Sequence, residues 1–244
     1  MNALPMTALQ ENLERVEDAI AAACRGAGRR REEVELMAVS KTKPAEAMIE
    51  AAGLGLRLFG ENRVQEFALK ALELGEMRSS VQCHLIGHLQ SNKAARAVEI
   101  FDGIDSLDSV RLAERLNEAG GKCGKRLPVL VEVKLSQEET KAGIDPASEE
   151  AARLLDSLSG FSNIDMRGLM TIAPWGVAES ETRACFRKLR ELREQWAAAH
   201  SRLKFDVLSM GMSGDFRIAI EEGATRIRVG TGLFGARARQ EDEA

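Results

Sequence analysis

The chain has 244 residues, and its 34 Lys and Arg against 38 Asp and Glu leave a formal net charge of −4. This nearly balanced charge, without a polybasic segment, argues against nucleic-acid and anionic-membrane partners and favours small molecules. The four cysteines lie far apart with no C-x-x-C pair, which excludes a zinc motif or disulfide framework and indicates reduced thiols in a cytoplasmic protein. No run approaches the ~20 apolar residues of a membrane span, and acidic residues interrupt the N-terminal stretch where a signal peptide needs apolar ones.

The first predicted element is an amphipathic helix over about residues 5–27. Apolar residues recur at helical spacing from Leu9 to Ile20, and Gly26 and Gly28 end the pattern. We expect this helix to be an addition to the main fold, because it precedes the first strand-like run.

Eight apolar, strand-like runs follow the helix and alternate with helical segments, without Pro- or Ser-rich linkers. This alternation predicts a parallel sheet covered by helices. Eight strands close a (β/α)8 barrel of the TIM type, which we expect over about residues 34–237 of a single domain 1–244; an open doubly wound sheet is the alternative. The weakest strand prediction is 103–108, which is short and polar. The runs are VELMAVSK (34–41), LRLFGEN (56–62), VQCHLIGH (81–88), GIDSLD (103–108), LPVLVEVKL (127–135), IDMRGLMTIA (164–173), FDVLSMG (205–211) and RIRVGTGLFG (226–235).

Two basic side chains occupy unusual places on these strands. Lys41 ends the first strand-like run, where it is either a snorkelling surface residue or a reactive amine at the mouth of a pocket. Arg228 lies among apolar neighbours on the last strand and is expected to point toward the barrel axis, in a structural salt bridge or toward a ligand. A lysine that is partly desolvated and close to a cation loses some proton affinity, which favours attack on an aldehyde to form a Schiff base.

The last two strands end in segments suited to phosphate. GMSGD (211–215) precedes a predicted helix, so Ser213 and the amide of Gly214 are expected at a helix N-terminus. VGTG (229–232) lets the amides of Gly230 and Thr231 approach a ligand closely and adds the threonine hydroxyl. The alternative is that Ser213 is only an N-cap and the glycines only form turns. Together the two segments predict a phosphate site.

Other polar residues near the strand ends leave their roles open. His84 and His88 could form a zinc pair, but no third ligand is evident, and a hydrogen-bonding structural role is favoured for His84. Glu132 and Lys134 share strand parity, so they face the same side of the strand. If that side is the barrel interior, Lys134 is a second amine near the mouth, held by Glu132. Asn62 is either a site residue or the N-cap of the next helix.

A further pair, Ser91 and Asn92, is expected to cap a helix whose first turn contains Lys93. A partner-facing role for this segment is the alternative.

Lys41, the phosphate segments and Arg228 together predict a ligand with an aldehyde at one end and a phosphate at the other. Pyridoxal 5′-phosphate (PLP), the vitamin B6 cofactor, has that layout. An aldolase-like lysine that acts on sugar phosphates without a cofactor is a further alternative.

Seven segments carry a family resemblance: AVSKTKP (38–44), FGENRVQE (59–66), HLIGHLQSNK (84–93), KAGI (141–144), GLMTIAP (168–174), LSMGMSGD (208–215) and RVGTGLFGAR (228–237). In order and spacing they resemble the YggS-type pyridoxal phosphate homeostasis proteins. The resemblance covers about residues 34–237 and implies a single (β/α)8 barrel like the N-terminal domain of alanine racemases, without their second domain.

The resemblance implies a role for each candidate residue. It makes Lys41 the cofactor-linked lysine in preference to Lys43, Lys93 and Lys134; Lys43 is expected to be solvated. It assigns the phosphate to Ser213, Gly214, Gly230 and Thr231, the pyridine nitrogen to Arg228, and a place beside the cofactor to Asn62.

The resemblance and the composition together argue against catalysis. Racemases of this fold use a tyrosine as one of two bases, and this chain contains no tyrosine. We therefore expect a monomeric carrier that holds PLP and hands it to apo PLP-dependent enzymes. A PLP-dependent amino-acid racemase or decarboxylase with weak activity is the alternative.

Overall fold

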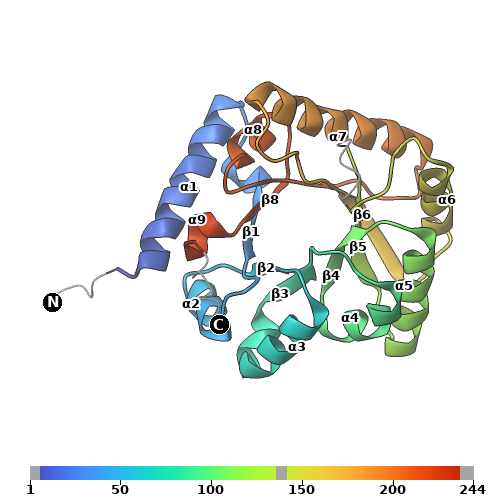
Figure 1. Cartoon of the computed structure of the whole chain (residues 1–244), viewed down its shortest axis with the longest axis horizontal. Helices are drawn as coiled ribbons and strands as arrows, with labels where there is room; N and C mark the ends of the chain where they lie inside the picture. The colour runs from blue at the N-terminus through green and yellow to red at the C-terminus, as the bar shows by residue number, and fades with distance from the viewer. Residues whose placement is uncertain (1–5, 136–141, 237–244) are drawn as a thin grey trace, which may run out of the picture.

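The computed structural model describes residues 6–135 and 142–236 of the chain. Eight parallel strands form a closed barrel in the order β1 to β8, and β8 pairs with β1 to close it (Figure 1). This confirms the (β/α)8 barrel and excludes the open sheet. Residues 1–5 and 237–244 lie outside the described residues, as does Lys141 of the KAGI segment, so the single domain 1–244 stays a prediction.

All eight predicted strands form. They are β1 (Glu35–Val39), β2 (Leu58–Glu61), β3 (Gln82–Leu85), β4 (Gly103–Leu107), β5 (Leu127–Glu132), β6 (Ile164–Met170), β7 (Val207–Met212) and β8 (Arg226–Val229). The helices are α1 (Ala8–Gly26), α2 (Ala45–Gly53), α3 (Val64–Glu73), α4 (Ala94–Ile100), α5 (Val110–Cys123), α6 (Glu149–Leu158), α7 (Glu179–Ala199), α8 (Phe216–Glu221) and α9 (Thr231–Phe234), with 3-10 turns at Arg31–Glu33, Gly75–Ser80 and Ser91–Lys93.

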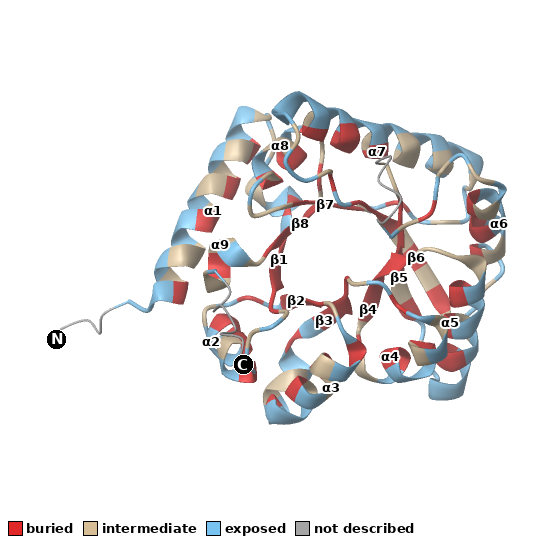
Figure 2. Ribbon diagram, viewed as in Figure 1, coloured by how far each residue is buried: buried red, intermediate tan, exposed pale blue. Residues whose placement is uncertain are grey.

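The apolar core lies mainly between the strands and the surrounding helices. Figure 2 shows the buried strands as an inner ring. The helices surround this ring and are buried on the side that faces it. Successive strand residues alternate in direction, so Met37 and Val39 on β1 point into the barrel with Leu58 and Ile86, while Ala38 joins the outer core. Lys41 continues the inward parity of β1.

The polar sequence of β4 is explained by the barrel interior. Asp105 is 1% exposed and accepts hydrogen bonds from Arg226 on β8 (3.0 Å) and contacts His84 Nδ1 on β3 at 2.8 Å. Gly103 leaves room for the imidazole, since a Cβ there would lie 2.5 Å from the His84 ring. His84 therefore has the hydrogen-bonding structural role that we favoured, at the end of the barrel away from Lys41.

Helix α1 lies beside α8 and α9 and holds both in place (Figure 1). Asn12 Nδ2 donates to the carbonyl oxygen of Leu233 on α9 at 2.8 Å. Arg29, just beyond α1, donates to the carbonyl oxygens of Ile220 (2.9 Å) and Ala224 (2.8 Å) at the end of α8. The additional helix thus supports the segments that follow β7 and β8.

The predicted helix cap at Ser91 and Asn92 is wrong, and the N-cap alternatives for Asn62 and Ser213 are excluded. Helices α3, α4 and α8 begin after Arg63, Lys93 and Asp215, respectively, and none of these three side chains makes a capping hydrogen bond. Asn62 and Ser213 are therefore not N-caps. The expected cap residues Ser91 and Asn92 lie instead in a 3-10 turn before α4.

Candidate functional site

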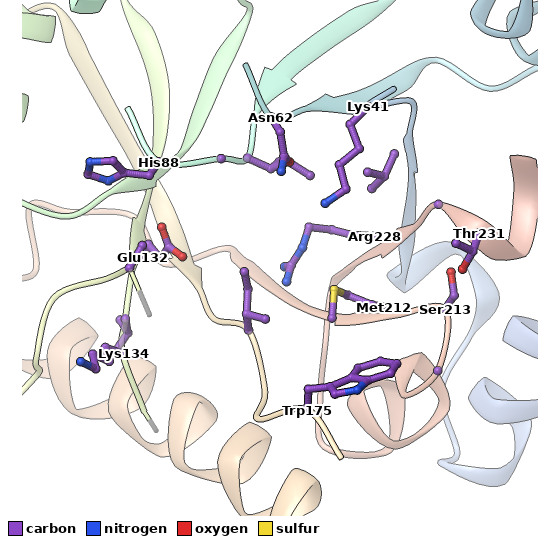
Figure 3. Close-up of a pocket in the computed structure, with 18 residues that line it drawn as sticks. Lys41, Asn62, His88, Glu132, Lys134, Trp175, Met212, Ser213, Arg228 and Thr231 are labelled. Carbon is purple, nitrogen blue, oxygen red and sulfur yellow. The ribbon is translucent and has the colours of Figure 1, made fainter. Parts of the chain in front are cut away.

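A cavity of about 810 Å³ opens at the carboxyl ends of the strands (Figure 3). Its volume lies within the range of small-molecule sites, about 300–1,000 Å³. Seven residues predicted from the sequence line it together: Lys41, Asn62, Ser213, Gly214, Arg228, Gly230 and Thr231.

Lys41 reaches into this cavity from the turn after β1. Figure 3 shows its side chain directed toward the space that Arg228 also faces. Asn62 enters from the neighbouring strand end, and its backbone lies so close to Gly87 that a Cβ on Gly87 would be 2.4 Å from the Asn62 carbonyl oxygen. The close approach of these two segments requires glycine after β3.

The prediction that Lys43 is solvated is wrong. Its ammonium donates to the carbonyl oxygen of Phe234 at 2.8 Å, where the last turn of α9 leaves carbonyls without intrahelical donors. This contact connects the turn that carries Lys41 to the segment after β8. The two lysines thus have different environments, because Lys43 contacts that segment and Lys41 lines the cavity.

The predicted phosphate residues form one cup after β7 and β8. Ser213 Oγ accepts a hydrogen bond from the Gly232 amide at 3.1 Å, which joins the two segments and leaves the hydroxyl proton available to a ligand. Amides of Gly214, Gly230 and Thr231 lie in the same cup. The predicted helix N-terminus is wrong in detail, since α8 starts at Phe216 and has only six residues. The cup is therefore formed by the loop before α8 and by the first residues of the four-residue helix α9.

Arg228 is buried and held by two neutral oxygens. It donates to Ser209 Oγ and to the Thr171 carbonyl oxygen, both at 2.8 Å. Burial lowers the pKa of Arg228, while the negative charges of Asp105 and Glu132 act in the opposite direction. None of the described ion pairs contains Arg228, so the alternative of a structural salt bridge is not supported, and its remaining N–H groups can serve a ligand.

Glu132 is a pocket residue whose importance the sequence reasoning missed. It is 4% exposed, its Oε2 has no hydrogen-bond partner among the described residues, and Figure 3 places it across the pocket from Ser213 and Thr231. Burial and the nearby charge of Asp108 raise the pKa of Glu132 to about 7, against the lowering effect of Arg228. The predicted pairing with Lys134 is absent from the described ion pairs, although both residues line the cavity.

The remaining walls were also not predicted. Ile86 and His88 follow β3, and Ile172 and Trp175 follow β6. Trp175 is 88% exposed at the mouth. Only the place of these residues directly after strand ends could have indicated them.

The donor set fits a phosphorylated aldehyde. An amine, a guanidinium with N–H groups to spare and a cup of amides and hydroxyls surround one cavity. Among the described residues, no helix has both the length and the apolar character to cross a membrane.

The fold and the site define a barrel of the alanine racemase type, and residues 7–238 match the family model described as "Alanine racemase, N-terminal domain". Curated proteins of similar sequence indicate the family within this class. The pyridoxal phosphate homeostasis protein of Vibrio cholerae is 41% identical over 235 residues, which are 95% of this chain and 98% of the relative. That of Aquifex aeolicus is 41% identical over 93% of this chain and 97% of the relative. The chain belongs to the pyridoxal phosphate homeostasis family.

Solved structures agree with this assignment. PipY of Synechococcus elongatus without PLP has a TM-score of 0.83 and 43% identity, covering 92% of this chain and 99% of PipY. PipY with PLP bound has a TM-score of 0.80 over 90% of this chain and all of that chain (100%). Alanine racemase of Clostridium difficile 630 has a TM-score of 0.72 at 17% identity, covering 94% of this chain and 58% of the racemase, and shows a common fold.

Proposed function

We propose that this protein binds pyridoxal 5′-phosphate reversibly as a Schiff base on Lys41 and serves PLP homeostasis and carriage. The observation that carries the proposal is the single cavity in which Lys41, Arg228 and the cup formed by Ser213 and Thr231 meet. The names of the curated relatives and the structure of PipY with PLP bound support it.

Each residue has a distinct part in this proposal. When bound, the cofactor supplies an aldehyde that reacts with a primary amine. Lys41 provides that amine, and Ser213 and Thr231 donate their hydroxyls, with the neighbouring amides, to the phosphate. Arg228 would hold the pyridine nitrogen. Because a guanidinium has only hydrogen-bond donors, it would favour the unprotonated ring, which withdraws electrons poorly. Asn62 would contact the ring.

The proposal includes the absence of catalysis by this chain. No tyrosine is present to act as one of two bases, and the guanidinium disfavours carbanion formation. We further propose a cytoplasmic monomer that passes PLP to apo-enzymes. The four cysteines, all free thiols, are consistent with a reducing compartment.

A weak racemase or decarboxylase is a second candidate, because Glu132 is a pocket carboxyl that can exchange a proton near neutral pH. Deuterium incorporation at Cα of amino acids separates the two functions. A rate well above that of free PLP, lost in Glu132→Gln, would establish catalysis and contradict the carrier.

The binding proposal is tested by the visible spectrum of the PLP-loaded protein. We expect an absorption band that borohydride removes, with a mass adduct on the peptide that contains Lys41. Lys41→Ala should lose the band and Lys134→Ala should keep it. A loaded wild-type protein without a band or adduct contradicts the proposal, and transfer of the cofactor to an apo-enzyme tests carriage.

A further inference from the structure

A buried charge network lies directly behind the turn that carries Lys41. Glu61, at the end of β2, is 0% exposed and accepts hydrogen bonds from Ser40 Oγ (2.7 Å) and Lys70 Nζ (2.8 Å). Lys70 on α3 is 6% exposed and also lies 2.9 Å from a carboxylate oxygen of Glu66. Buried charges are tolerated when they are paired, and here one ammonium serves two carboxylates.

This network contacts the backbone on both sides of Lys41. Lys70 Nζ donates to the carbonyl oxygen of Ser40 at 2.9 Å, immediately before Lys41. Glu66 Oε1 accepts the backbone N–H of Thr42 at 2.7 Å, immediately after it. Helix α3 therefore holds the two peptide groups that flank the lysine.

The backbone held in this way is strained. Ser40 to Lys43 form a turn, closed by a 3.0 Å hydrogen bond from the Lys43 amide to the Ser40 carbonyl, with Lys41 and Thr42 at its centre. Thr42 has φ +63°, the one positive value at a non-glycine position among the described residues. Turns with positive φ at this position favour Gly or Asn, and a β-branched residue there is disfavoured. Such a conformation persists only where its surroundings determine it.

We propose that Glu61, Glu66 and Lys70 are positioning residues that fix the strained turn and so direct the amine of Lys41 toward the aldehyde of the cofactor. The proposal rests on the proposed function, in which Lys41 binds PLP. None of the three residues is among those that line the cavity, so they act through Ser40 and Thr42 and not by contact with the ligand. If the network served only to pack α3, its loss would not weaken the binding of the aldehyde end of the ligand selectively.

The first test compares two ligands on matched variants. PLP can bond to Lys41 through its aldehyde, whereas pyridoxine 5′-phosphate has an alcohol in that place and keeps only the groups that face the phosphate cup and Arg228. We expect Glu66→Ala and Lys70→Met to weaken PLP binding about tenfold or more and to change pyridoxine 5′-phosphate binding less than about twofold, because a charged hydrogen bond to the backbone is lost. Glu66→Gln keeps an acceptor oxygen and should restore most of the PLP affinity. Glu73→Ala, exposed on the same helix, is the control.

The second test needs no cofactor. In Glu66→Ala we expect the Thr42 amide to exchange its hydrogen about tenfold faster, with core amides unchanged. Modification of Lys41 by a small amine-reactive reagent, followed by mass spectrometry, should change in rate while modification of exposed Lys122 does not.

The outcomes separate the two proposals. An equal loss of affinity for both ligands in a folded variant overturns the positioning role. An unchanged rate of hydrogen exchange at the Thr42 amide in Glu66→Ala overturns it as well. If Lys70→Met does not fold, the partly exposed Glu66 still decides the question. If wild-type protein forms no PLP adduct on Lys41, the proposed function fails, and the exchange and modification rates still decide whether the network holds the turn.

Discussion

The hydroxyl of Ser209 on β7 accepts a hydrogen bond of 2.8 Å from the buried guanidinium of Arg228 on β8. The carbonyl oxygen of Thr171, after β6, accepts a second one at the same distance. Because both acceptors are neutral, they orient the guanidinium without cancelling its charge. Three successive strands of the barrel thus present one fixed cation to the cavity.

Ser209→Ala removes one of these two anchors. We expect PLP affinity to fall about three- to tenfold, because the loss of one hydrogen bond lets the guanidinium rotate. Equilibrium dialysis with PLP measures the change, and Ser79→Ala, at an exposed turn, is the matched control. An affinity equal to that of the wild type would show that Thr171 alone suffices to orient Arg228.

Glu132 makes folding stability depend on pH. Its pKa rises from 4.5 to about 7 on folding. Between these values the folded state retains a proton that the unfolded state releases, so stability falls as pH increases through this window. We expect Glu132→Gln to be more stable than the wild type by about 3 kcal/mol at pH 8 and nearly equal at pH 4.

Urea unfolding at both pH values tests this expectation, with Glu73→Gln on the surface of α3 as the control. An effect of Glu132→Gln on stability that is equal at pH 4 and pH 8 would mean that the pKa of Glu132 does not change on folding, and would contradict this expectation.

Asp105 produces the opposite pH dependence. Burial alone would raise its pKa, but His84 and Arg226 outweigh burial and lower it from 3.8 to about 2. The resulting stability is present above pH 4 and is lost as pH falls toward 2. We expect Asp105→Asn to reduce the free energy of unfolding by about 3 kcal/mol at pH 7, because Arg226 then lacks its buried partner.

The loss in Asp105→Asn should shrink as the pH approaches 2. Thermal or urea unfolding across this range measures it, and Asp206→Asn, at an exposed carboxylate, is the control. A loss that does not depend on pH would assign the effect to packing and not to charge.

Gly211 permits the end of β7 to approach α8 closely. Its φ is +91°, and a Cβ would lie 2.5 Å from the Ala219 Cβ and 2.9 Å from the Phe216 Cα. We expect Gly211→Ala to displace Ser213 and to weaken PLP and pyridoxine 5′-phosphate about equally, by about tenfold. Gly53→Ala on α2, where a Cβ meets nothing within 4 Å, is the control. Selective loss of PLP alone would contradict a role for Gly211 in the phosphate cup.

Most of the fold could be predicted because its signals are local. Alternating apolar runs indicated all eight strands, including β4, whose polar residues we could not explain. The sequence alone does not explain Asp105, because its partners His84 and Arg226 come from two other strands and meet it only inside the barrel. Helix starts were less predictable, because α3, α4 and α8 begin without capping side chains.

The site was predictable to the extent that its residues end strands. Parallel strands of a barrel bring their carboxyl ends together, so Lys41, Asn62, Arg228 and the phosphate segments had to meet if the barrel closed. Glu132 shared the inward parity of its strand, but the sequence could not show that its carboxyl group lacks a partner.

The sequence by itself determined the order of the elements and the chemistry at each strand end, because both depend on patterns a few residues long. Only the tertiary structure decided what supports Lys41. Glu66 lies 24 residues from Thr42, and Lys70 lies 30 residues from Ser40. No spacing rule links a helix face to a turn so far away. The fold brings α3 beside the ends of β1 and β2, where its side chains reach Ser40, Thr42 and Glu61.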